Sequence, residues 1–123
     1  IEILSDGSPT RSFCYISDAV AGFIKILMSD YNGEVFNIGN DEMEITIGQL
    51  AEKIAEIVCD VTVIYNKSSD TEYLTDNPQR RCPDLKKART LIKYNPSVNL
   101  ETGLRRLFDW YKETLDIEYN QRY

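Results

Sequence analysis

The chain has 123 residues, of which 42% are hydrophobic and 28% charged, and its formal net charge at pH 7 is −6. This composition is typical of one globular domain with a single modest core, and it excludes a disordered or fibrous protein. The acidic balance, with one tight basic pair at Arg80 and Arg81, argues against nucleic acid or an anionic membrane as a partner.

Three further observations bear on the setting of the protein. No apolar run approaches the roughly 20 residues that span a bilayer, and no signal peptide is visible. The cysteines Cys14, Cys59 and Cys82 have no paired spacing and the chain has no histidine, so we expect reduced thiols in a cytoplasmic protein and no metal site. Because the sequence opens without methionine, we expect it to be part of a longer chain.

The first residues predict two extended segments around a turn. Residues 1–4 and 13–16 are rich in β-prone side chains, and residues 5–9 between them have the Ser, Asp, Gly and Pro typical of turns. A helix should follow, with Ser17 or Asp18 as its N-cap. Its apolar stripe, which we interpret as core or interface, ends before Asn32-Gly33 and consists of Val20, Phe23, Ile24, Leu27 and Met28.

The middle of the chain predicts a strand, a helix and a strand. Residues 35–38 and 61–65 have the composition of short strands. Between them, Thr46 and Gln49 have the three-residue spacing of a capping box, and the apolar residues that follow recur at helical spacing. The expected order so far is strand, helix, strand, helix, strand.

The last third predicts one long loop and two helices. Residues 66–83 are polar and irregular, a length of loop that is usually functional or disordered. Helices are expected over residues 85–92 and from Asn99 to about Leu115, the second with an aromatic cluster that we interpret as core or interface. We therefore expect one domain over residues 1–115 and a polar tail over residues 116–123.

Two short arginine-containing stretches are the strongest candidates for a binding site. Arg11 follows the turn at residues 5–9, and Arg80-Arg81 lie in a proline-flanked loop just before a helix. A guanidinium group offers a planar fork of donors that matches phosphate oxygens. The alternatives are a surface arginine after a hairpin turn, and loop charges paired with Asp76 or Asp84. The carboxylates of Asp18 and of the second helix fit solvated helix faces.

Two motifs of dinucleotide enzymes do not occur in this sequence. No G-x-G-x-x-G turn is available to hold a pyrophosphate, and no tyrosine is followed four residues later by a lysine. We therefore expect this chain on its own to bind no NAD and to catalyse nothing.

Four stretches resemble the extended short-chain dehydrogenase/reductases that act on nucleotide sugars. The longest is Asp6-Gly7-Ser8-Pro9-Thr10-Arg11-Ser12-Phe13-Cys14-Tyr15-Ile16-Ser17-Asp18. It is followed by Phe36-Asn37-Ile38-Gly39-Asn40, by Gln79-Arg80-Arg81-Cys82-Pro83-Asp84, and by the segment from Tyr94 to Leu104. The likeness extends over residues 1 to about 115.

The resemblance implies a fold and a function. The fold would be α/β, a small C-terminal substrate-binding subdomain of an NAD(P)-binding Rossmann-type enzyme whose Rossmann half is absent here. The parent would be an NAD-dependent nucleotide-sugar epimerase, dehydratase or decarboxylase that oxidises the sugar at C4 with bound NAD. It is most similar to the UDP-glucuronate decarboxylase branch, with a dTDP-glucose 4,6-dehydratase nearly as close. Expected partners are a nucleotide-diphosphate sugar, the Rossmann domain and a second copy in a homodimer. The alternative is a stand-alone, non-catalytic interaction module derived from such an enzyme.

The resemblance also assigns site residues. The arginine matching Arg11 contacts phosphate, and the residues matching Glu2, Ile3 and Leu4 lie along the nucleotide base. The one matching Arg81 reaches the diphosphate or sugar and has a catalytic role in decarboxylase-like members, with Arg80 as the substitute if the register differs. Arg11 and Arg81 should therefore share one diphosphate site. An apolar face should be uncovered where the Rossmann half packs, around Phe13, Tyr15, Phe36 and Ile38.

Overall fold

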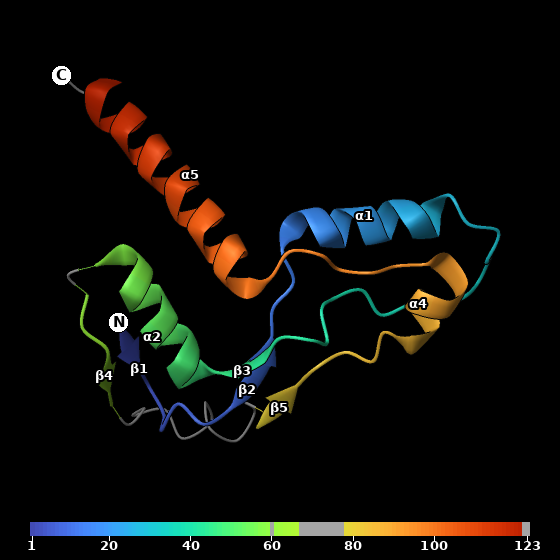
Figure 1. Ribbon diagram of the computed structural model, residues 1–123, viewed down its shortest axis with the longest axis horizontal. Coiled ribbons are helices and arrows are strands. Elements are labelled where there is room, and N and C mark those ends of the chain that lie inside the picture. The colour runs from blue at the N-terminus through green and yellow to red at the C-terminus, as the bar shows by residue number, and fades with distance from the viewer. Residues whose placement is uncertain (60, 67–77, 122–123) are drawn as a thin grey trace.

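The computed structural model describes residues 1–59, 61–66 and 78–121, which form a small α/β fold. Figure 1 shows its elements, which in chain order are β1 (Glu2–Ile3), β2 (Thr10–Ser12), α1 (Ile16–Leu27), β3 (Glu44–Thr46), α2 (Ile47–Val58), β4 (Ile64–Tyr65), β5 (Arg80–Arg81), α4 (Lys86–Ile92) and α5 (Leu100–Gln121). The α/β class predicted from the sequence is confirmed.

The strands form two small sheets. One pairs β1 with β4 in parallel, and the other has the order β3-β2-β5, with β2 antiparallel to β3 and parallel to β5. Helix α2 lies beside β1 and β4, whereas α1 and α4 lie together at the opposite end of the molecule (Figure 1). The three-stranded sheet therefore lies between two groups of helices.

The beginning of α2 follows the local pattern predicted from the sequence. The Thr46 hydroxyl accepts a hydrogen bond from the Gln49 backbone N–H at 3.0 Å, and the Gln49 side chain accepts one from the Thr46 backbone N–H at 3.1 Å. The predicted turn is also present, since Gly7 has the left-handed φ of 74° and its carbonyl accepts from the Gly48 N–H at 3.0 Å. This contact ties the turn before β2 to the first turn of α2.

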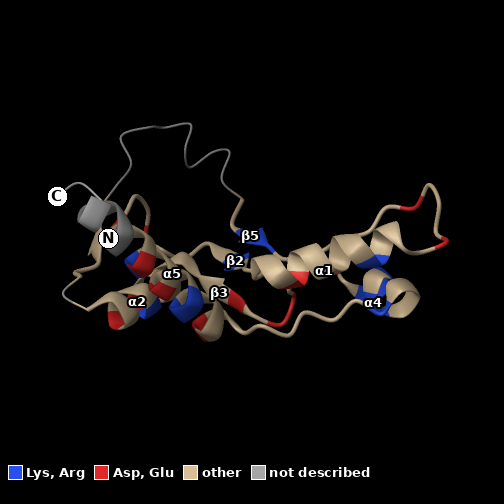
Figure 2. Ribbon diagram, turned by 90° about the horizontal axis from the view of Figure 1, so that it is seen from above, with Lys and Arg blue, Asp and Glu red and all other residues tan. Residues whose placement is uncertain are grey.

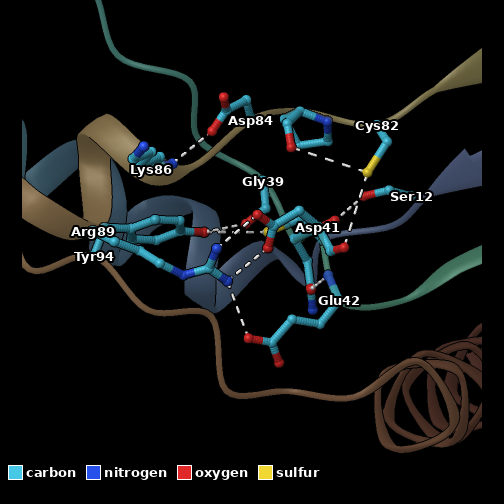
Figure 3. A network of polar contacts seen from close by, with 12 residues as sticks. Ser12, Gly39, Asp41, Glu42, Cys82, Asp84, Lys86, Arg89 and Tyr94 are labelled. Carbon is cyan, nitrogen blue, oxygen red and sulfur yellow. Dashed lines mark hydrogen bonds and ion pairs between the residues drawn. The ribbon is translucent and has the colours of Figure 1, made fainter.

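The main core lies between α1, α4 and the segment before β3. Its buried members are Leu85, Ala88, Ile92 and Tyr94, with Phe36 and Ile38 packed against them. The Tyr94 hydroxyl donates to the Gly39 carbonyl at 2.8 Å and lies 3.6 Å from the Cys14 sulfur (Figure 3). Burial, followed by the contact with Cys14, raises the pKa of the Tyr94 hydroxyl, so this core phenol stays protonated.

Several predicted bounds are wrong near the first helix. The second strand is β2 at residues 10–12 instead of 13–16, and α1 begins at Ile16 with Tyr15 as its N-cap and no side-chain cap. Neither Ser17 nor Asp18 caps α1, because the Asp18 carboxylate is directed to another part of the chain. It accepts from the backbone N–H groups of Ser97 and Val98 at 3.0 and 2.9 Å.

The predicted strand at residues 35–38 is also wrong, since these residues form no strand among those described. A strand needs a neighbour to satisfy its backbone groups, and no described strand lies beside this segment. Conversely, β3 was not predicted and β5 falls inside the predicted loop, because both depend on pairing with β2. The part of that loop at residues 67–77, including Asp76, lies outside the described residues.

The helices of the last third agree better with the sequence. α4 matches the expected helix at 85–92, and α5 begins after Asn99, whose side chain accepts from the Thr102 N–H at 2.8 Å. α5 continues to Gln121, beyond the end expected near Leu115.

No helix within the described ranges is both long and apolar enough to cross a membrane. All three cysteines fall within the described residues and are free thiols.

Candidate functional site

Arg11 and Arg81, although far apart in the sequence, are direct neighbours in the sheet. The parallel pairing of β2 with β5 aligns Arg11 with Arg81 and Thr10 with Arg80. Figure 2 shows the basic residues of the two strands side by side. Because paired residues of adjacent strands project to the same face, Arg11 and Arg81 share one face of this sheet.

Arg80 projects to the opposite face and is engaged there. Its guanidinium donates to Glu44 on β3 from two nitrogens, from Nε at 2.8 and 3.1 Å to the two carboxylate oxygens and from Nη2 at 2.7 Å. The Thr10 hydroxyl also donates to Glu44. The Arg80 side chain, followed by Thr10, lowers the pKa of Glu44, and Glu44 raises the pKa of Arg80. Arg80 is thus held as an ion pair, whereas no carboxylate among the described residues pairs with Arg81.

A hollow of about 430 Å³ lies between β1, Arg11 and helix α2. Its lining includes Glu2, Ile3 and Leu4, the residues expected along the nucleotide base. Glu2 and Leu4 are exposed, but the Ile3 side chain is only 5% exposed and belongs to the core. The contact of all three residues with a nucleotide base stays a prediction.

Arg81 borders a different, shallower hollow. Its neighbours there include Ser12 on β2, Arg80 on β5, and Cys14 and Cys82, which follow the two strands. Arg11 and Arg81 are thus adjacent in the sheet, yet they do not line one common cleft in this structure. The alternation of side chains along β5 favours the face of Arg11 for the Arg81 guanidinium.

A second ion-pair cluster holds the segment that leads into β3. Arg89 on α4 donates two bonds to Asp41, both at 2.6 Å, and one to Glu42 at 3.0 Å (Figure 3). The Arg89 side chain lowers the pKa of Asp41, since it stabilises the charged carboxylate. Sequence reasoning missed this cluster, because no local spacing links residues that are 48 positions apart.

Asp18 is the other polar residue whose place the sequence did not reveal. It is 8% exposed, and it accepts from two backbone N–H groups and from the Ser97 hydroxyl at 3.2 Å. The interpretation of Asp18 as part of a solvated helix face is therefore wrong. Its role is to fix the chain just before α5.

The predicted apolar surface is present but on other residues. Phe13, Tyr15, Phe36 and Ile38 are half-buried. The exposed apolar side chains instead follow α1, which carries few charges in Figure 2, and the middle of α5. On α1 and its C-cap they are Ile16, Val20, Phe23, Ile24, Leu27 and Met28, and on α5 they are Leu107, Trp110, Tyr111 and Leu115. Because these side chains are exposed, they do not belong to the core of this structure, and an interface at these two helices stays a prediction.

Neither the glycine turn of a dinucleotide site nor a cluster of metal ligands occurs among the described residues. β2 leads into α1 through Phe13, Cys14 and Tyr15, so the glycine turn that holds a pyrophosphate at a helix N-terminus has no counterpart there. Within the described ranges, no three His, Cys, Asp or Glu side chains gather closely enough to hold a metal ion. The arginine pair on the sheet is the feature of this chain that suits an anionic ligand.

Comparisons with known proteins agree with the motifs and the fold. Residues 1–39 match the model of the NAD dependent epimerase/dehydratase family. The whole chain is 34% identical to UDP-glucuronic acid decarboxylase 1 of Danio rerio, of which it spans 28%. Both comparisons point to similarity with the NAD-dependent epimerase/dehydratase family, and the chain spans less than a third of this curated relative.

Solved structures of this family match the chain over a similar share of their length. The UDP-glucuronic acid 4-epimerase of Bacillus cereus, in complex with UDP-glucuronic acid and NAD, is 32% identical, with a TM-score of 0.78 over 92% of this chain and 35% of that one. The UDP-glucose 4-epimerase of Thermotoga maritima, with UDP-glucose, is 28% identical, with a TM-score of 0.81 over 94% of this chain and 35% of that one. The match over about a third of these family members fits the C-terminal part expected from the sequence motifs.

Proposed function

We propose that this chain is the substrate-binding part of an NAD-dependent nucleotide-sugar enzyme, most similar to the UDP-glucuronate decarboxylases. Its ligand is a nucleotide-diphosphate sugar, and the diphosphate is held by Arg11 and Arg81. The observation that carries this proposal is the in-register pairing of the two arginines across β2 and β5. Like charges directly opposite each other on adjacent strands repel, and a diphosphate bound between them would relieve that repulsion.

The hollow beside Arg11 supports a place for the nucleoside. It has about 430 Å³, within the usual range for small-molecule sites, and Glu2 and Leu4 on its rim are exposed. With the diphosphate at Arg11, a base in this hollow would contact Glu2 and Leu4. The sugar would then extend toward Arg81.

The exposed apolar face of α1 supports a partner that provides the NAD site. Leu27 and Met28 are 84% and 81% exposed. A group of exposed apolar side chains marks an interaction site, whereas a single exposed one does not. The extended residues 35–38 also have no neighbouring strand among the described residues. A Rossmann-type domain would cover the helix face and pair with this segment, and it would bring the dinucleotide site that this chain does not provide.

The test is a pair of alanine variants in the full-length gene product. Arg11→Ala and Arg81→Ala should each weaken binding of UDP about ten- to a hundredfold, because a charge-assisted hydrogen bond contributes about 1.5–3 kcal/mol. NAD affinity should be unchanged. Isothermal titration calorimetry measures both affinities. The matched control is Arg105→Ala, which removes an exposed arginine on α5 whose ion-pair partner among the described residues is Glu101 in the same helix.

Equal UDP affinity in wild type and both arginine variants would contradict the proposal. A loss of NAD affinity that parallels the loss of UDP affinity would also contradict it, since the two sites are assigned to different parts of the enzyme. Titration of this chain alone with NAD should show no binding.

A further inference from the structure

Glu44 links all three strands of the β3-β2-β5 sheet. From β3, its carboxylate accepts a hydrogen bond from Thr10 on β2 and three from two nitrogens of Arg80 on β5. The Glu44 side chain is 25% exposed and that of Arg80 is 67% exposed, so the carboxylate is the more enclosed partner. A side-on pair of this kind, with two N–H donors on one carboxylate, fixes orientation as well as distance.

The strand that this pair holds is short. β5 has 2 residues, and its backbone joins β2 near Thr10, whose N–H donates to the Gln79 carbonyl at 2.8 Å. Few main-chain bonds therefore define its register. Because side chains alternate between the two faces of a strand, a slip by one residue would exchange Arg80 and Arg81.

We propose that Glu44 is a positioning residue that selects Arg81 instead of Arg80 for the diphosphate site. By holding Arg80 on its own face of the sheet, Glu44 turns Arg81 to the face of Arg11. Glu44 does not touch the ligand in this arrangement, and it acts through Arg80 and the register of β5. The inference rests on the proposed function, since it presupposes that Arg81 contacts the diphosphate.

The experiment uses the full-length gene product, with UDP and NAD as probes in isothermal titration calorimetry. Glu44→Gln preserves the shape of the side chain but removes its charge. It should weaken UDP binding about three- to tenfold, the effect of losing one charged contact of moderate strength, and leave NAD binding unchanged. In an Arg81→Ala background, Glu44→Gln should cause no further loss.

Two variants separate positioning from a general effect on folding. Glu34→Gln removes a comparable ion pair, with Lys87 at 2.7 Å, away from β5, and it should bind UDP like the wild type. Arg80→Gln breaks the same pair as Glu44→Gln from its exposed side. It should weaken UDP binding to the same extent, and it replaces Glu44→Gln if that variant does not fold.

The possible failures are distinguishable. Wild-type UDP affinity in Arg81→Ala overturns the proposed function, and the positioning role falls with it. If Arg81→Ala weakens binding but Glu44→Gln and Arg80→Gln do not, the positioning role alone is overturned. An equal loss from Glu44→Gln in the wild-type and Arg81→Ala backgrounds also overturns it, because the effect would then not pass through Arg81.

Discussion

Replacing Asp18 with alanine removes the acceptor for two backbone N–H groups, those of Ser97 and Val98, at 3.0 and 2.9 Å. Hydrogen bonds to a charged acceptor contribute about 1.5–3 kcal/mol each, and water can replace part of this because Ser97 is exposed. We expect Asp18→Ala to lower the free energy of unfolding by about 2–3 kcal/mol. Asp18→Asn keeps one oxygen in place and should lose about half as much.

Urea unfolding followed by circular dichroism measures the total loss, and hydrogen–deuterium exchange at Ser97 and Val98 locates it. Both amides should exchange faster in Asp18→Ala than in the wild type, because they lose their acceptor. Asp109→Ala, which removes an exposed carboxylate from α5, is the control and should change stability by less than about 0.5 kcal/mol. Unfolding of Asp18→Ala within that margin, or unaltered exchange at the two amides, would refute the assignment of Asp18 as a structural acceptor.

Three further predictions concern helix ends, packing and pH. Thr46→Ala removes the capping box of α2 and should cost about 1 kcal/mol in urea unfolding, whereas a loss below about 0.3 kcal/mol would contradict a working cap. Gly22→Ala would place a methyl group 2.9 Å from the Tyr94 ring, so α1 must shift. We expect the free energy of unfolding to fall by about 1–2 kcal/mol despite the better helix propensity of alanine. An unchanged free energy of unfolding would contradict this close packing. The Asp41–Arg89 pair lowers the pKa of Asp41 in the folded protein. The contribution of this pair to the free energy of unfolding is therefore complete above the ordinary carboxyl pKa near pH 4, and it is lost as the pH falls through the lowered pKa. Stability curves of wild type and Arg89→Gln should therefore converge below about pH 4, and a constant gap down to about pH 2 would contradict this linkage.

Much of the local structure follows from the sequence because its causes are local. The capping box of α2 depends on two residues three positions apart, and the turn at Gly7 depends on Ser, Asp and Gly within a few positions. The motif around Arg11 and the one around Arg81 are likewise continuous in the chain. Both arginines can therefore be named as site candidates, and the family can be recognised, from the order of residues alone.

The tertiary structure decided how those candidates are arranged. Three contacts set this arrangement: the pairing of Arg11 with Arg81, the ion pair of Arg80 with Glu44, and the hydrogen bond from Ser97 to Asp18. Each of them joins residues that are 36 to 79 positions apart in the sequence. Such contacts leave no periodic pattern, because they form only when the intervening chain has folded. The sequence alone could not separate Arg80 from Arg81, since adjacent residues of a strand differ only in the face to which they project. The register with β2 sets that face, and register is a property of two strands together.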